Sequence, residues 1–131
     1  MANRLFESRG TLAMAVSCGI FAVDDSDASV NSVAAMRDGW NINISGHKAR
    51  MVGDDILAGA HNIITMTMGH KNHLCALYPD FADKVHAVKE LYSDGRSSDI
   101  DDPFGASLDV YIQCARQIED FLMNFDWEGY L

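Results

Sequence analysis

Short apolar segments alternate along this chain with segments whose apolar residues recur every three or four positions. The apolar segments are typical of buried strands and cover residues 13–22, 62–67 and 85–88. The helical patterns lie around them and cover residues 4–9, 31–38, 54–58, 69–77 and the stretch after Ser107. This alternation predicts an α/β fold with a parallel sheet flanked by helices. Gly10 and Gly39 are expected to end the helices that precede them.

The helix predicted after Ser107 is the longest in the chain. Its apolar residues repeat at three and four, so one face is expected to pack against the sheet. These residues are Leu108, Tyr111, Ile112, Ala115, Ile118, Leu122 and Phe125. The segment before this helix, residues 92–105, is rich in Ser, Asp and Gly. At that length without periodicity, it is expected to be a functional loop.

Composition limits where the chain works and what it binds. Its 131 residues suit one domain, and no apolar run approaches the ~18 residues of a membrane span. The first residues lack a secretory signal and the three cysteines form no disulfide framework, so a cytoplasmic location is expected. The net charge is −9 and the basic residues are scattered. Nucleic-acid backbones and anionic membranes are therefore not expected as partners.

Asp102 is the strongest chemical candidate, because a carboxylic acid on a loop can protonate a leaving oxygen. It is followed by Pro103, Phe104 and Gly105. An Asp before Pro is also common in ordinary turns, so the spacing alone leaves both interpretations open.

Five stretches of the chain, which follow the family's order, resemble segments of the low-molecular-weight protein tyrosine phosphatases. Residues 98–111 resemble the acid loop and last helix of that family, particularly of the bacterial branch that includes protein arginine phosphatases. Residues 17–22 are similar to its Ser-Ala-Gly-Ile-Phe-Ala segment, and residues 46–50 to its His-Lys/Arg-Ala/Ser-Arg segment. Residues 64–67, together with residues 83–85, fall in their expected places, so the resemblance runs from Met1 to about Phe125.

The resemblance implies a three-layer fold with strand order 2-1-3-4, and it also implies that the first, central strand is missing. In the family this strand leads into a phosphate loop of the form Cys-x-x-x-x-x-Arg-Ser-Pro-Met-Ala-Glu, whose Cys attacks phosphorus. Met1-Ala2-Asn3 occupies the Met-Ala-Glu position. The chain is therefore expected to be a single phosphatase-like domain over residues 1–131 that is truncated at its N-terminus.

No cysteine of this chain replaces the missing nucleophile. In a Cys-x5-Arg loop the arginine stands six residues after the cysteine. None of the three cysteines has an arginine at that position. Asp24 stands six residues after Cys18, Phe81 six after Cys75, and Asp120 six after Cys114. We therefore expect no hydrolysis through a cysteinyl-phosphate from this chain as given.

The resemblance also assigns roles to individual residues. It implies that Asp102 is the general acid and that Phe104 walls the substrate entrance, although a core aromatic that anchors the loop is the alternative for Phe104. Ser17 and His47 match positions that support the phosphate loop by hydrogen bonds, or are satisfied by local backbone. The substrate implied is a phosphorylated protein or a small phosphoester. No metal or cofactor is expected, since His70 and His73 lack a third ligand.

Without a central strand, residues 13–22 and 62–67 would share no partner and would expose unpaired backbone along apolar edges. Self-association by strand exchange or edge pairing is therefore expected. Three interpretations stay open at this point. The chain is a shortened form of a working phosphatase, a non-catalytic interaction module, or a misassembled fragment that aggregates readily.

Overall fold

The computed structural model describes residues 1–92 and 98–130 of the chain. The chain forms two compact units. The first comprises Met1–Met51 and Asp102–Asn124, and the second comprises Val52–Asp101 and Phe125–Leu131. None of the described helices is long and apolar enough to cross a membrane.

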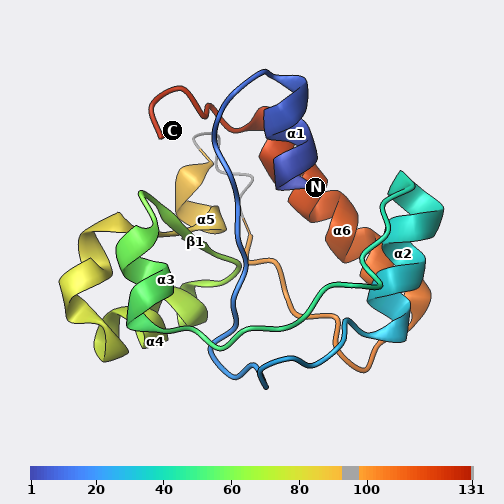
Figure 1. The fold of residues 1–131 in the computed structure, drawn as a ribbon, viewed down its shortest axis with the longest axis horizontal. Coiled ribbons are helices and arrows are strands. Elements are labelled where there is room, and N and C mark those ends of the chain that lie inside the picture. Colours follow the sequence, from blue (N-terminus) through green and yellow to red (C-terminus); the bar gives the residue numbers. More distant parts are fainter. Residues whose placement is uncertain (93–97, 131) are drawn as a thin grey trace. The chain divides into compact units, whose positions relative to one another are not determined.

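Three helices build the first unit: α1 (Ala2–Ser8), α2 (Val30–Trp40) and α6 (Leu108–Asn124). Both α1 and α2 pack against α6 (Figure 1). The side chains buried in this unit include Tyr111, Ala115 and Leu122 of the periodic apolar face predicted for the last helix, and the other residues of that face are half-buried. The buried side chains of the unit are Phe6, Ala35, Tyr111, Ala115, Phe121 and Leu122. The predicted helices over residues 4–9 and 31–38 and after Ser107 are thus confirmed.

The prediction that Gly39 ends the second helix is wrong. Helix α2 continues through Gly39 to Trp40 and ends at Asn41, which adopts a left-handed conformation with φ 52°. Asn41 donates its N–H to Arg37 O (3.1 Å), and Ile42 donates to Met36 O (3.1 Å). Asparagine tolerates left-handed backbone because its short polar side chain costs little there, so Asn41 closes the helix where a glycine was expected to.

The predicted strand over residues 13–22 is also not formed. Residues 11–18 are extended in unit 1 but belong to no sheet, and they appear in Figure 1 as a plain dark blue tube. Pairing begins only at Gly19, which forms an isolated parallel bridge with Met51. A strand needs a neighbouring backbone to fill its ladder of hydrogen bonds, and no described segment of unit 1 supplies one before Gly19.

The second unit contains the sheet. Its elements in chain order are α3 (Asp54–Gly59), β1 (Ile63–Thr65), α4 (Met68–Leu77), the 3₁₀ helix η1 (Pro79–Lys84), β2 (Val85–Ala87) and α5 (Val88–Leu91). Strands β1 and β2 are parallel neighbours, with Ile63 opposite Val85 and Thr65 opposite Ala87. Helix α4 packs on both strands. The strands predicted over residues 62–67 and 85–88 are confirmed, although each is three residues long.

The core of the second unit forms where α3, α4 and β2 meet. Leu57, Leu74 and Val85 are 1%, 4% and 2% exposed and pack together with Val52. Helix α4 starts at a threonine cap, since Thr67 Oγ1 accepts the N–H of His70 at 3.0 Å. Leu74 places the apolar face of α4 in this core.

An ion pair between Lys71 and Glu90 joins α4 to α5 within this unit. Lys71 Nζ lies 2.9 Å and 2.7 Å from the two carboxylate oxygens of Glu90. Glu90 Oε2 also accepts the N–H of Ala87 at 2.9 Å. The hydrogen bond from Lys71, followed by that from Ala87, lowers the pKa of Glu90 below its ordinary value. The ionised form is therefore favoured by folding.

Replacing Glu90 by glutamine is expected to lower the free energy of unfolding at pH 7 by less than about 1 kcal/mol, since the glutamate side chain is 36% exposed and solvent screens the pair. Because the folded pKa is lowered, the stabilisation is fully present above the ordinary Glu pKa of about 4.3 and disappears as the pH falls through the folded value. Urea unfolding of both proteins at pH 7 and at about pH 3 measures this. An equal difference at both pH values would contradict an ionic contribution.

Candidate active site

The acid loop, defined as residues 102–106, is a tight turn in unit 1. Asp102 Oδ1 accepts the backbone N–H of Phe104 at 3.0 Å, and Ala106 donates its N–H to Pro103 O at 2.8 Å. Gly105 sits at the third position of this turn with φ +79°, in the left-handed region that a type II turn requires. The turn fixes the backbone that follows the Asp102 carboxylate.

The turn is also tied to the two helices next to it. Asn31 in the first turn of α2 donates its side-chain N–H to Ala106 O at 3.1 Å. Helix α6 begins directly after Ser107, whose carbonyl accepts the N–H of Tyr111 at 3.2 Å. The acid loop is thus held at its C-terminal end, while the side chain of Asp102 remains exposed.

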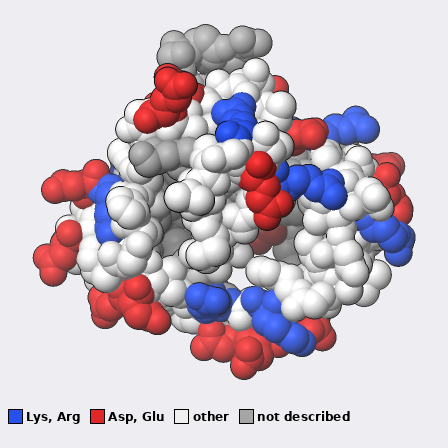
Figure 2. All heavy atoms as spheres, turned by 45° about the horizontal axis from the view of Figure 1, so that its top comes forward, with Lys and Arg blue, Asp and Glu red and all other residues white. Residues whose placement is uncertain are grey.

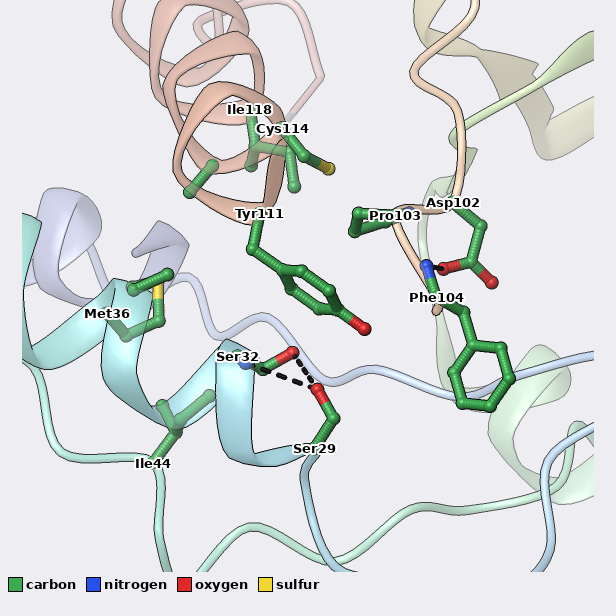
Figure 3. Close-up of a pocket in the computed structure, with 12 residues that line it drawn as sticks. Ser29, Ser32, Met36, Ile44, Asp102, Pro103, Phe104, Tyr111, Cys114 and Ile118 are labelled. Atoms are coloured by element: carbon green, nitrogen blue, oxygen red, sulfur yellow. Dashed lines mark hydrogen bonds between the residues drawn. The ribbon is translucent and has the colours of Figure 1, made fainter. Parts of the chain in front are cut away.

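Phe104 is not a core residue, which rules out the alternative that it anchors the loop from inside. Its side chain is 84% exposed. Figure 3 shows the ring turned away from the neighbouring helices and toward solvent, beside the Asp102 carboxylate. An exposed aromatic ring next to an exposed acid is the arrangement that a substrate-facing wall needs.

A pocket of ≈ 360 Å³ lies on the other side of the acid loop, between α2 and α6. Its walls are mainly apolar, and Ala35, Met36, Ala115 and Ile118 contribute to them. In Figure 3 the Tyr111 hydroxyl points into the space between the acid loop and α2. Tyr111 is only 9% exposed, and its hydroxyl has no hydrogen-bond partner among the described residues.

The mouth of the pocket at α2 is polar. Ser29 caps the helix, because its Oγ accepts the N–H of Ser32 at 3.2 Å and its hydroxyl donates to Ser32 Oγ at 2.8 Å. The sequence pattern places Tyr111 on an apolar helix face and predicts no further role for it. The one signal for a further role was a tyrosine, with its polar tip, among purely apolar neighbours.

Ser17 and His47 do not meet the acid loop through any hydrogen bond between described residues. Both side chains are exposed. Ser17 precedes the bridge between Gly19 and Met51, and His47 precedes Lys48, which pairs with Asp27. The two residues thus stand beside a small paired region of unit 1, and their role in supporting a phosphate loop stays a prediction.

Burial and a neighbouring charge act in opposite directions on the pKa of the Cys18 thiol. Partial burial raises the pKa of the Cys18 thiol above its ordinary value, and the nearby positive charge of Arg50 offsets only part of that effect. A catalytic cysteine needs the opposite shift, because the thiolate is the attacking form. Cys114 lines the apolar pocket, and Cys75 packs against the core of the second unit.

The sequence was compared with known families and structures. Residues 1–127 match the family described as low molecular weight phosphotyrosine protein phosphatase. The chain belongs to this phosphatase family. A protein-arginine-phosphatase of Bacillus subtilis (strain 168) is 30% identical over 126 residues, which cover 93% of this chain and 82% of the relative. A low molecular weight protein-tyrosine-phosphatase, PtpB of Staphylococcus epidermidis, is 31% identical over 106 residues, which cover 81% of this chain and 72% of the relative.

Solved phosphatase structures confirm the fold. The low molecular weight protein tyrosine phosphatase from T. tengcongensis has a TM-score of 0.86 and 31% identity, and the match covers 93% of this chain and 82% of that structure. The YwlE arginine phosphatase from Geobacillus stearothermophilus has a TM-score of 0.80 and 28% identity, and the match covers 93% of this chain and 78% of that structure. The chain therefore has the phosphatase fold, α/β with a parallel sheet flanked by helices.

Charge on this phosphatase family member is mixed. On the face drawn in Figure 2, Lys and Arg side chains lie scattered among Asp and Glu side chains. No group of three or more His, Cys, Asp or Glu side chains in the described part of the chain is placed to hold a metal ion.

Proposed function

We propose that this chain carries the general-acid half of a phosphatase active site, with Asp102 as the proton donor and Phe104 beside the substrate. This proposal takes residues 1–131 as one phosphatase-like domain. The observation that carries it is the acid loop, which holds an exposed carboxylate on a fixed turn although it contributes nothing to the core. A structural turn would not need an exposed aromatic ring next to that carboxylate.

The proposed reaction needs two groups, a nucleophilic cysteine and a general acid. In the first step a cysteine thiolate forms a bond to phosphorus while the bond from phosphorus to the leaving oxygen or nitrogen breaks, and Asp102 gives its proton to that leaving atom. The 131 residues contain no Cys-x5-Arg, and the Cys18 thiol is not activated. We therefore propose that this chain by itself does not hydrolyse phosphoproteins.

The substrate class of the complete site is a phosphorylated protein side chain. Relatives named for arginine phosphatase and for tyrosine phosphatase activity are similarly distant, at 30% and 31% identity. Phosphotyrosine and phosphoarginine therefore both belong in the test. A cytoplasmic location is part of the proposal, because Cys18 and Cys75 carry free thiols, as is usual in reducing compartments.

The test compares the 131-residue chain with a fusion that places the strand and phosphate loop of the Bacillus subtilis relative before Met1. Phosphate release from phosphotyrosine and phosphoarginine peptides is measured for both. We expect no release above buffer from the chain alone and clear release from the fusion. A fusion whose loop Cys is replaced by Ser is the control, and it must be inactive. Release from the chain alone would overturn the proposal, as would an inactive fusion that folds.

The second candidate function is a non-catalytic interaction module that self-associates by edge pairing or strand exchange. It is favoured by Leu12, Met14 and Val16, which are exposed and make no backbone hydrogen bond among the described residues. It predicts a stable homo-oligomer at micromolar concentration in light scattering, whereas the phosphatase proposal requires no such assembly.

A further inference from the structure

The chain that leads into the acid loop is fixed to the turn between β1 and α4. Asp99 Oδ1 accepts the backbone N–H of Met68 at 3.0 Å, and Ile100 donates its N–H to Met66 O at 2.9 Å. Asp99 and Met68 stand 31 positions apart in the sequence, and all four residues belong to the second unit. Two bonds between distant parts of the chain therefore hold Asp99 and Ile100, which are called the anchor below.

The anchor is buried, whereas the residues that follow it are not. The side chain of Ile100 is 5% exposed, and Asp99 is half-buried. Asp101 and Asp102 are both exposed. Ile100 is therefore the last residue before Asp102 that packing holds in place, and only Asp101 lies between them.

Helix α4 has a local cap besides the bond from Asp99. The first N–H groups of a helix find no partner within the helix. Thr67 supplies the usual cap, since its Oγ1 accepts the N–H of His70 at 3.0 Å. Asp99 accepts a second N–H at the same end, and its negative charge suits the positive end of the helix dipole. This second cap joins α4 to the anchor, which the local cap does not do.

The placement of a proton donor decides how well it works. A general acid must lie within hydrogen-bond reach of the leaving atom, and a misplacement of about 1 Å can lower the rate by roughly 10²-fold. The hydrogen bonds of the acid loop fix only the backbone that follows Asp102. The backbone that precedes Asp102 is held by the anchor.

We propose that Asp99 is a positioning residue for the general acid. Its carboxylate holds the chain against the first turn of α4, the buried Ile100 keeps the next residue in place, and Asp102 is presented from a fixed backbone. This inference rests on the proposed function of Asp102 as the proton donor, because Asp99 acts only through Asp102.

The test uses the fusion with a strand and phosphate loop, and it measures kcat for a phosphotyrosine peptide and for nitrophenyl phosphate, whose leaving group needs little protonation. Asp99→Ala removes the acceptor of the Met68 N–H. We expect kcat for the peptide to fall roughly 10–10²-fold, with a much smaller loss for nitrophenyl phosphate. Asp99→Asn keeps an oxygen that can accept this N–H, so it should restore most of the activity. Equal losses for the two substrates in Asp99→Ala would overturn the proposal.

Thr67→Ala is the matched control. It removes the other cap at the same end of α4 and leaves the anchor in place. Urea unfolding verifies that Thr67→Ala and Asp99→Ala lose similar stability. We expect kcat of the control to be unchanged for both substrates. A loss as large as that of Asp99→Ala would contradict the proposal, because the helix and not the anchor would then be responsible.

Nuclear magnetic resonance of the 131-residue chain gives a readout that needs no activity. The ¹⁵N order parameters of residues 100–102 are expected to fall in Asp99→Ala from about 0.85, the value of rigid backbone, and to stay unchanged in Thr67→Ala. If they stayed unchanged in both variants, Asp99 would not hold the chain and the proposal would fail.

A double variant in the fusion shows whether Asp99 acts through Asp102. Once Asp102 is replaced by asparagine there is no proton to position, so adding Asp99→Ala should cause little further loss of kcat. An undiminished further loss would overturn the proposal. A loss in Asp102→Asn without one in Asp99→Ala would reject the role of Asp99 alone, whereas no loss in Asp102→Asn would reject the proposed function together with it.

Discussion

Replacing Asp102 by asparagine in the fusion with a strand and phosphate loop is expected to lower kcat for a phosphotyrosine peptide by roughly 10²–10⁴-fold, the usual contribution of a general acid. Asparagine keeps the size of the side chain and can still accept the N–H of Phe104, which Asp102 bonds at 3.0 Å. The turn should therefore survive, while the proton for the leaving oxygen is lost.

The dependence on the leaving group distinguishes an acid from a residue that only shapes the loop. A nitrophenolate leaves without protonation much more readily than tyrosine does, so Asp102→Asn should affect nitrophenyl phosphate far less than a phosphotyrosine peptide. The basic limb of the kcat profile against pH should also disappear in this variant. Equal losses for both substrates would indicate a structural role.

Asp101→Asn is the matched control for this experiment. It removes the neighbouring carboxylate and leaves Asp102 and the Pro103 turn in place. We expect kcat to change much less than for Asp102→Asn. If the two variants lost activity equally, the negative charge of the whole segment, and not one proton donor, would be responsible.

Replacing Leu57 by alanine is expected to lower the free energy of unfolding by about 2–5 kcal/mol. Leu57 on α3 is 1% exposed and packs with Val52, Leu74 and Val85, so the substitution leaves a cavity at the centre of the second unit. A loss of this size is a large part of the stability of a small domain. Urea unfolding followed by circular dichroism gives the value.

Leu77→Ala makes the same chemical change at the end of α4, where the side chain is 56% exposed. We expect its effect to stay within about 0.5 kcal/mol, as for other surface substitutions. A similar loss at both positions would mean that the core described for the second unit does not dominate its stability.

The helices could be predicted from the sequence because their signals are local. Periodic apolar residues and caps such as Ser29 and Thr67 fix where a helix lies and begins, and both caps are present. The end of α2 was missed because Asn41, in place of a glycine, takes the left-handed position. Residues 13–22 failed as a strand because pairing depends on a partner segment, which local pattern does not contain.

The candidate site could be predicted only in part. The acid loop was found through its resemblance to a family, and the turn at Pro103 and Gly105 agrees with the residue types there. The pocket behind it could not be found, because it depends on how Ala35 and Ala115 bring α2 and α6 together. The side chains of Ser17 and His47 lie in exposed segments whose contacts no sequence pattern specifies.

The two hydrogen bonds between Asn3 and Ala15 fix which residues of the extended segment face α1. Because side chains and hydrogen-bonding groups both alternate with a period of two, holding one residue against α1 settles the phase of the whole segment from Leu12 to Val16. Inserting a single residue between Asn3 and Ala15 would exchange the inward and outward sets, turning alanines to solvent and Met14 toward the helix. The side-chain amide of Asn3, on a seven-residue helix, thus determines which residues between Leu12 and Val16 face solvent.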